Sequence, residues 1–192
     1  MILSVGAFVR VGLLVLVAVV LQISALSQIG ILGGHADVIV LTVAAVAFYA
    51  GAVPGSAAGF TAGLLLDLLT GATMGASSLV LTAVGYAVGR FREVRDPSHG
   101  LLPVPVGACA TAGWVLAFAA VSLMLDIGAR VSPLVIHDMI VTVLLNALLA
   151  IPLFTGVRKL LGPSLAVDLR ELRKRRRPPR EAGPLGLRGL EV

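Results

Sequence analysis

Charged residues are scarce in this chain. Only 13% of its 192 residues are Asp, Glu, Lys or Arg, whereas 58% are hydrophobic, and the mean hydropathy is +1.02. Soluble domains carry about 25% charged and about 45–50% apolar residues. The composition excludes an ordinary soluble domain and predicts an integral membrane protein. A chain of this length holds one helical bundle and a short tail.

Cysteine and recognisable catalytic motifs are also missing. Cys109 is the single cysteine, which excludes an intramolecular disulfide and a cysteine-based metal site. The sequence has no glycine-rich loop followed by lysine, no HExxH and no nucleophile elbow. His137 and Asp138 form a lone dipeptide, and their side chains would point about 100° apart on a helix. We therefore expect no enzyme, no cofactor and no metal site.

Apolar runs suited to membrane crossing occur six times. They cover about Val11–Leu32, Val38–Val53, Gly55–Leu69, Ala76–Gly89, Val104–Leu125 and Leu134–Thr155. The third and fourth span about 21 Å at 1.5 Å per residue, less than the roughly 30 Å of a hydrocarbon core, so we expect them to be tilted or recessed. Val53-Pro54-Gly55 should break the second run from the third. The sequence predicts an all-α membrane protein with about six transmembrane helices in residues 1–157.

The basic residues predict the orientation. Of the 15 Lys and Arg residues, all but Arg130 fall in segments that six crossings place on one side. The positive-inside rule then puts both termini in the cytoplasm. A cleaved signal peptide ending near Leu26 is the alternative; it would leave five spans, but the first apolar run exceeds the 7–15 residues usual for such a peptide.

Glycines spaced four apart form the most conspicuous pattern. Such a spacing is costly in a soluble helix, but in a membrane it lets helix backbones approach closely. One place in the row is taken by a carboxylate, which lipid tolerates poorly unless protein surrounds it. We expect a helix-packing or partner-binding ridge at Gly55, Gly59, Gly63, Asp67, Gly71 and Gly75.

A second stripe with the same spacing lies in the last span, at Asp138, Thr142 and Asn146. Polar residues in such a row hydrogen-bond to a neighbouring helix in many membrane proteins. The alternative is that the stripe lines a pocket open to the outside. Gln22, in the first span, could serve either purpose.

The last part of the chain is rich in charge and proline. We expect residues 158–192 to form a basic, largely disordered cytoplasmic tail. Its cations are suited to contact with anionic lipids, or they serve only to fix the topology. No aromatic or folded scaffold supports nucleic-acid binding. The residues expected at the lipid are Arg170, Arg173, Lys174, Arg175, Arg176 and Arg177.

The glycine-rich part of the sequence resembles a known family. The stretch from Gly55 to Asp67, followed by Gly71, Gly75 and Val84-Gly85-Tyr86, is similar to the rod shape-determining protein MreD. Asp37, at the start of the second span, also fits. The resemblance covers about residues 1–157 and adds Gly85 to the packing set. It implies a non-catalytic subunit of the bacterial inner-membrane elongation machinery. The implied partners are MreC, the MreB cytoskeleton, RodA and a class B penicillin-binding protein.

The same resemblance raises an alternative function. The family is similar in fold to the substrate-binding subunits of energy-coupling-factor vitamin transporters. A vitamin-binding subunit needs an outer pocket with converging aromatic and polar groups. Trp114 is the only tryptophan and falls in the middle of a span, so the sequence favours the scaffold.

Overall fold

The structure, a computed structural model, describes residues 5–24, 30–31, 33–71, 73–94, 103–124 and 133–176. Side chains are described within these ranges from residue 6 to residue 162, except for residues 30–31 and 133–135. The elements in chain order are α1 (Val5–Ser24), β1 (Gly30–Ile31), β2 (Gly34–His35), α2 (Val38–Ala50), α3 (Ala52–Thr70), α4 (Ala76–Val94), α5 (Pro103–Met124) and α6 (Pro133–Arg176). The prediction of an all-α fold with six helices is confirmed.

Four of the helices are long and apolar enough to cross a membrane. These segments are Gly6–Ser24, Ala52–Thr70, Pro103–Met124 and Ile136–Gly162. Their large apolar side chains are exposed on the outside of the bundle, for example Leu13, Leu116 and Leu148. An apolar exterior of this extent is stable in lipid and would be an aggregation site in water.

Helix α2 forms the centre of the bundle and contacts all five other helices. All of its residues except Val38 and Tyr49 are buried. Its 13 residues extend only about 20 Å, so α2 is the short helix. Our expectation that the third and fourth helices are short is wrong, because α3 and α4 each contain 19 residues. Both helices extend beyond the apolar runs from which we predicted their lengths.

The break between α2 and α3 lies at Gly51, three residues before the position we predicted. Gly51 has φ +102°, in the region that favours glycine, and it ends one helix and begins the next. Pro54 lies in the first turn of α3. Proline is compatible with that turn, where the backbone N–H groups have no partner within the helix. The proline therefore begins a helix here and does not separate two.

The first helix ends earlier than the apolar run suggests. It ends at Ser24, and the predicted continuation to Leu32 is wrong. Residues Gly30 and Ile31 instead pair in antiparallel register with His35 and Gly34. Gly33, at the turn, has φ +88°, which a glycine adopts without strain.

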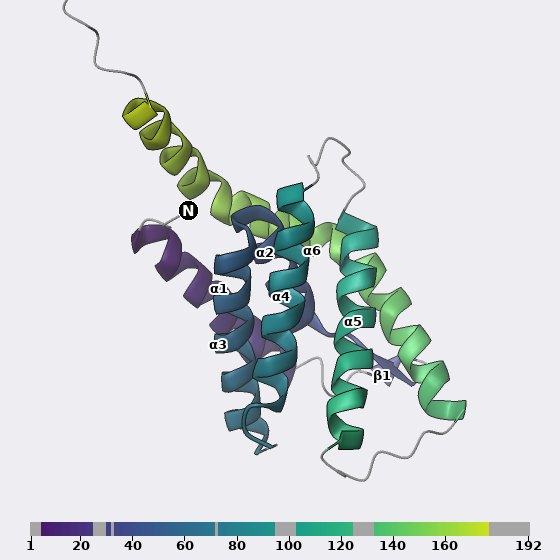
Figure 1. Cartoon of the computed structure of the whole chain (residues 1–192). Helices are drawn as coiled ribbons and strands as arrows, with labels where there is room; N and C mark the ends of the chain where they lie inside the picture. Colours follow the sequence, from purple (N-terminus) through teal and green to yellow (C-terminus); the bar gives the residue numbers. More distant parts are fainter. Residues whose placement is uncertain are drawn as a thin grey trace, which may run out of the picture.

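Figure 1 shows α3 and α4 side by side, with α5 and α6 together in another part of the bundle. Helix α6 continues well beyond the bundle, and its backbone is helical to Arg176. The boundary we expected at residue 157 therefore does not coincide with the end of a helix. Residues 177–192 of the predicted tail lie outside the described part of the chain.

Candidate functional site

The glycines of α3 form its contact with α4. A Cβ built on Gly55 would lie 2.8 Å from the carbonyl oxygen of Gly85. At Gly59 and Gly63, a Cβ would lie closer than 3.0 Å to the backbone of Leu81 and Ser78 respectively. Real Cβ atoms essentially never make such contacts with backbone. The two helices therefore touch through their main chains along the predicted ridge.

Gly71 and Gly75 have a different role from the one expected. They flank the turn between α3 and α4, with φ values of +65° and +96°, and a Cβ on either would meet nothing within 4 Å. Neither glycine packs closely against another helix among the described residues, and a part for them in a partner interface stays a prediction. Their value is conformational, because L side chains rarely adopt these backbone angles.

Asp67 continues the ridge and binds the start of α4. Its Oδ2 accepts hydrogen bonds from the backbone N–H groups of Gly75, at 2.9 Å, and Ser77, at 3.2 Å. Gly75 immediately precedes α4 and Ser77 lies in its first turn, where backbone N–H groups lack partners within the helix. The carboxylate is 1% exposed, and its Oδ1 has no hydrogen-bond partner among the described residues. Asp67 thus caps α4 from within α3.

The polar stripe of α6 holds the segment that leads into α2. Oγ1 of Thr142 accepts a hydrogen bond from the backbone N–H of His35, at 3.2 Å. Oδ1 of Asn146 accepts one from the backbone N–H of Asp37, at 3.0 Å. Asp138 packs against Gly33, where any Cβ would collide with its carboxylate. Thr142 and Asn146 therefore accept hydrogen bonds from backbone N–H groups that lie outside the helices' own hydrogen bonding.

Gln22 of α1 holds the same segment from the other side. Its Oε1 accepts from the backbone N–H of Val38, and its Nε2 donates to the carbonyl of Ala36, both at 2.9 Å. Nε2 also lies 3.3 Å from Oδ1 of Asp37. Non-helical backbone at membrane depth is tolerated where protein surrounds and satisfies it. The sequence placed Gln22 among the polar residues of the first span but gave no sign of its partners.

A second polar cluster, which we call the basic end, lies where α2 ends, α3 begins and α4 ends. Arg92 donates a hydrogen bond to the carbonyl of Tyr49, at 2.7 Å. Glu93 accepts one from the backbone N–H of Ala52, at 3.1 Å, and pairs with Arg90 at 3.0 Å. A cation thus meets the C-terminus of α2 and an anion meets the N-terminus of α3, as the helix dipoles favour.

Glu93 lies beyond the apolar part of α4, which we predicted to end at Gly89. The hydrogen bond from Ala52 lowers the pKa of Glu93, and Arg90 lowers it further. Glu93 therefore stays ionised at the pH of a cell. The sequence did not single out this residue, because its partner is 41 positions away.

Five of the six basic residues expected at the lipid, Arg170 to Arg176, lie on the helical backbone of α6. Their side chains lie outside the described part, as does all of Arg177. Within the described side chains, no group of three His, Cys, Asp or Glu could hold a metal ion. His137 lies 3.5 Å from Asp138, and both are exposed.

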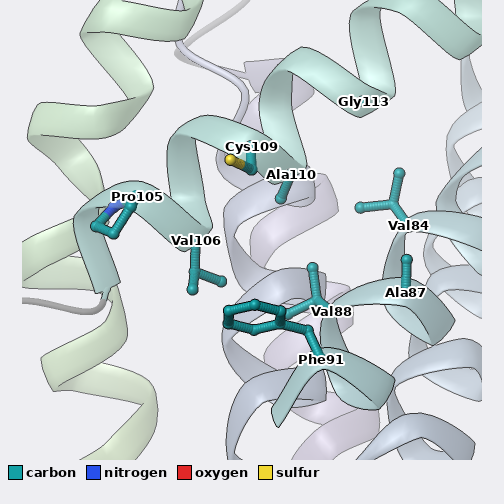
Figure 2. Close-up of a pocket in the computed structure, with 9 residues that line it drawn as sticks. All are labelled: Val84, Ala87, Val88, Phe91, Pro105, Val106, Cys109, Ala110 and Gly113. Carbon is teal, nitrogen blue, oxygen red and sulfur yellow. The ribbon is translucent and has the colours of Figure 1, made fainter. Parts of the chain in front are cut away.

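An apolar groove runs between α4 and α5 (Figure 2). We call it the α4–α5 groove, and its volume is about 290 Å³. Small residues form much of its α5 wall, and the single cysteine is exposed there. Its lining consists of Val84, Ala87, Val88, Phe91, Pro105, Val106, Cys109, Ala110 and Gly113.

Three further hollows accompany it, one of which, of about 430 Å³, lies between the start of α4 and the end of α5. The α5–α6 groove, of about 380 Å³, lies on the other side of α5 and includes Ala112 and Leu116. A smaller cavity of about 250 Å³ lies between α1, α2, α3 and α5. Unlike the grooves, it includes polar side chains, namely Gln22, Asp37 and Thr70, next to Trp114.

Comparison with known proteins gives one match. A family model described as rod shape-determining protein MreD matches residues 3–162. The match includes α1 to α5 in full and α6 as far as residue 162. No curated protein and no solved structure matches the chain.

Proposed function

Because the chain belongs to the MreD family of rod shape-determining membrane proteins, we propose that it is a non-catalytic scaffold of the cell-elongation machinery. Membership in the family gives a role in rod shape determination. The proposal adds the location, the bacterial inner membrane, and the mode of action, which is to hold other proteins together. The feature that best supports this mode of action is the α4–α5 groove, an apolar surface that the described residues leave uncovered (Figure 2).

We propose that the occupant of the α4–α5 groove is the transmembrane helix of an MreC-type single-span partner. Lipid gives helices no hydrophobic reason to associate, so they associate best where small residues allow close approach. Ala87, Ala110 and Gly113 are such residues, and all three line the groove. A Cβ on Gly113 would meet nothing within 4 Å, so none of the described residues uses the space beside that glycine.

The free-energy cost of a glycine at position 113 also supports a partner helix in the groove. A glycine inside a helix is less favourable than alanine by about 1 kcal/mol. At Gly55 and Gly59 that cost is offset by contact with α4, but Gly113 has no comparable contact with the part of the chain that the structure describes. An incoming helix would supply it.

The single cysteine allows a direct test. Cys109 is exposed in the groove and needs no engineering. Cysteines placed one at a time along the partner's span should form a disulfide with Cys109, under mild oxidation in membranes, at positions repeating every three to four residues. That period is expected because one face of the partner helix would lie in the groove.

The matched control moves the cysteine to the other groove. In a Cys109→Ala, Ala112→Cys double variant, the thiol lies in the α5–α6 groove on the same helix. It should cross-link weakly or not at all with the same partner positions. Equal cross-linking from residues 109 and 112, or cross-linking without periodicity, would remove the support for this docking surface.

We further propose that the basic end faces the cytoplasm, with both termini on that side. Arg90, Arg92 and Arg158 support this orientation, because Arg92 and Arg158 both lie close enough to act electrostatically on Tyr49. The positive-inside rule assigns such a cluster to the cytoplasmic side. MreB is then expected at this end. RodA and the class B penicillin-binding protein would be reached within the membrane.

The basic residues of α6 fit the same orientation. A helix that continues past the bundle to Arg176 would carry Arg170, Arg173 and Lys174 to the cytoplasmic leaflet. Each basic residue near an anionic surface contributes about 1 kcal/mol. We propose that this segment holds the chain against anionic lipid.

The vitamin-transport alternative receives no support from the cavities. A pocket for a drug-sized ligand has a volume of about 300–1,000 Å³. The cavity that combines polar side chains with a tryptophan measures about 250 Å³. The grooves of about 290 and 380 Å³ are lined almost entirely by apolar atoms, and the hollow of about 430 Å³ includes no aromatic side chain.

A further inference from the structure

The small cavity beside α2 combines a carboxylate with an aromatic ring. Asp37 and Trp114 line it together, at the end of the bundle remote from Arg92 and Glu93. Trp114 is 9% exposed and comes from the middle of α5. Gln22 is also 9% exposed. Leu66 and Thr70 of α3 close the cavity from another side.

The carboxylate of Asp37 lacks a strong cationic partner. Among the described residues, neither ion pair involves Asp37, and no Lys or Arg acts on its charge. The exposed His35 acts on its charge, and the side chain of Trp114 provides a hydrogen bond to it. Gln22 provides a neutral hydrogen bond at 3.3 Å. A carboxylate that is partly removed from water is costly unless an opposite charge approaches it.

The helix dipole offsets only part of this charge. Asp37 precedes the first residue of α2, and a helix N-terminus is equivalent to about half a positive charge. The rest of the carboxylate's charge can attract a cation that enters the cavity. The indole of Trp114 provides an apolar surface beside the carboxylate, against which the stem of such a cation can pack.

From this juxtaposition we propose that the Asp37–Trp114 cavity binds an organic cation, a primary ammonium or a guanidinium group on a short apolar stem. The volume of about 250 Å³ suits a group the size of one lysine or arginine side chain. The apolar stem would pack on Val40 and Leu66, and the charged end would reach Asp37. This binding does not depend on the partner helix proposed for the α4–α5 groove.

Trp114 is the only tryptophan in the chain, so its fluorescence reports on this cavity alone. The full chain in mild detergent is titrated with n-butylammonium, n-butylguanidinium and, as an uncharged control, 1-pentanol. We expect a saturable change in Trp114 emission with the cations and none with the alcohol. Acetyl-Gly-Arg-Gly-amide distinguishes the source: tighter binding of the peptide indicates a basic side chain of another protein, and tighter binding of the free cations indicates a small molecule.

Two pairs of variants test the assignment. Asp37→Asn should weaken binding by about tenfold or more, since a charge-assisted contact is lost. Asp138→Asn, which neutralises a carboxylate outside the cavity, should leave binding unchanged. Leu66→Phe should also weaken binding, because it fills the cavity and keeps the carboxylate. Leu68→Phe, at a position that is 58% exposed, is its control.

A loss of binding can be distinguished from a loss of folding in each variant, because size-exclusion profiles and circular dichroism report folding independently of Trp114. Loss of the saturable response in a folded Asp37→Asn or Leu66→Phe variant, with the controls intact, supports the site. No saturable response to any cation or to the peptide overturns it. A response of equal size in the folded Asp37→Asn chain also overturns it.

Discussion

Gly55 and Gly85 face each other across α3 and α4 so closely that a Cβ on either would lie within 3.0 Å of the other's carbonyl oxygen. The contact is between two main chains, and no side chain can move to relieve it. Gly59 and Gly63 repeat the arrangement one and two turns further along α3. The close approach of α3 and α4 therefore requires that these positions carry no side chain.

The first prediction concerns this contact. Gly59→Leu should force α3 and α4 apart and destabilise the folded chain by on the order of 1–3 kcal/mol or more, as overpacking does. Ala57→Leu, two residues away at an exposed position, should have little effect. Thermal unfolding in detergent, with the yield of monodisperse protein, measures both. Equal behaviour of the two variants would mean that the ridge has no special packing role.

The second prediction separates the roles of the Asp67 carboxylate. Asp67→Asn keeps an oxygen that can accept from Gly75 and Ser77, so most of the stability should remain. Asp67→Ala removes the cap of α4 and should cost about 0.5–2 kcal/mol. The same unfolding assay compares them. A loss in the Asn variant as large as in the Ala variant would show that the charge, and not the cap, stabilises this end of the bundle.

The third prediction concerns the segment that enters α2. Asn146→Ala removes the acceptor for the backbone N–H of Asp37 and leaves a partly buried donor without a partner. A loss of about 1–3 kcal/mol is expected. Leu144→Ala, on the exposed face of the same helix, is the control, since Leu144 is 66% exposed. If the two substitutions cost the same, the polar stripe does not hold the segment.

The fourth prediction is a dependence on pH. The pKa of Glu93 is lowered in the folded chain from an ordinary value of 4.5, so its hydrogen bond to Ala52 stabilises the fold above that value. The contribution should be lost as the pH falls from 4.5 through the lowered pKa. The effect should be small, because the side chain is exposed. Glu93→Gln should flatten the part of the stability profile below pH 4.5, and an unchanged profile would contradict the assignment.

Local patterns in the sequence predicted much of the fold for physical reasons. Apolar runs show where helices lie, because a segment in lipid must be apolar and must satisfy its own backbone hydrogen bonds, which a helix does. The four-residue spacing of Gly55, Gly59 and Gly63 predicted a common face. Composition alone, however, predicted a break at Pro54, and the chain breaks at Gly51. A proline ends a helix or begins one, and the choice depends on residues that precede it.

The polar contacts could not be predicted in the same way. Gln22 and Asn146 come from two helices and meet Asp37 in the segment that leads into α2, and Asp37 and Asn146 are 109 positions apart. The position of Trp114 in the middle of a span argued against a pocket, yet the structure places it beside Asp37. Asp37 lies at the start of α2, and α2 is shorter than the other helices. The apolar run in the sequence does not show how short α2 is, because it does not mark where the helix ends.

The most direct test of the account is to purify the full chain from a rod-shaped host in mild detergent and to identify the proteins that remain bound. A folded variant with Gly113→Phe, at an exposed position that lines the α4–α5 groove, is purified in parallel, with Leu116→Phe in the α5–α6 groove as its control. We expect an MreC-type single-span protein to remain bound to the natural chain and to Leu116→Phe, and to be lost from Gly113→Phe. Recovery of the natural chain with no such partner, or equal retention by all three chains, would contradict it.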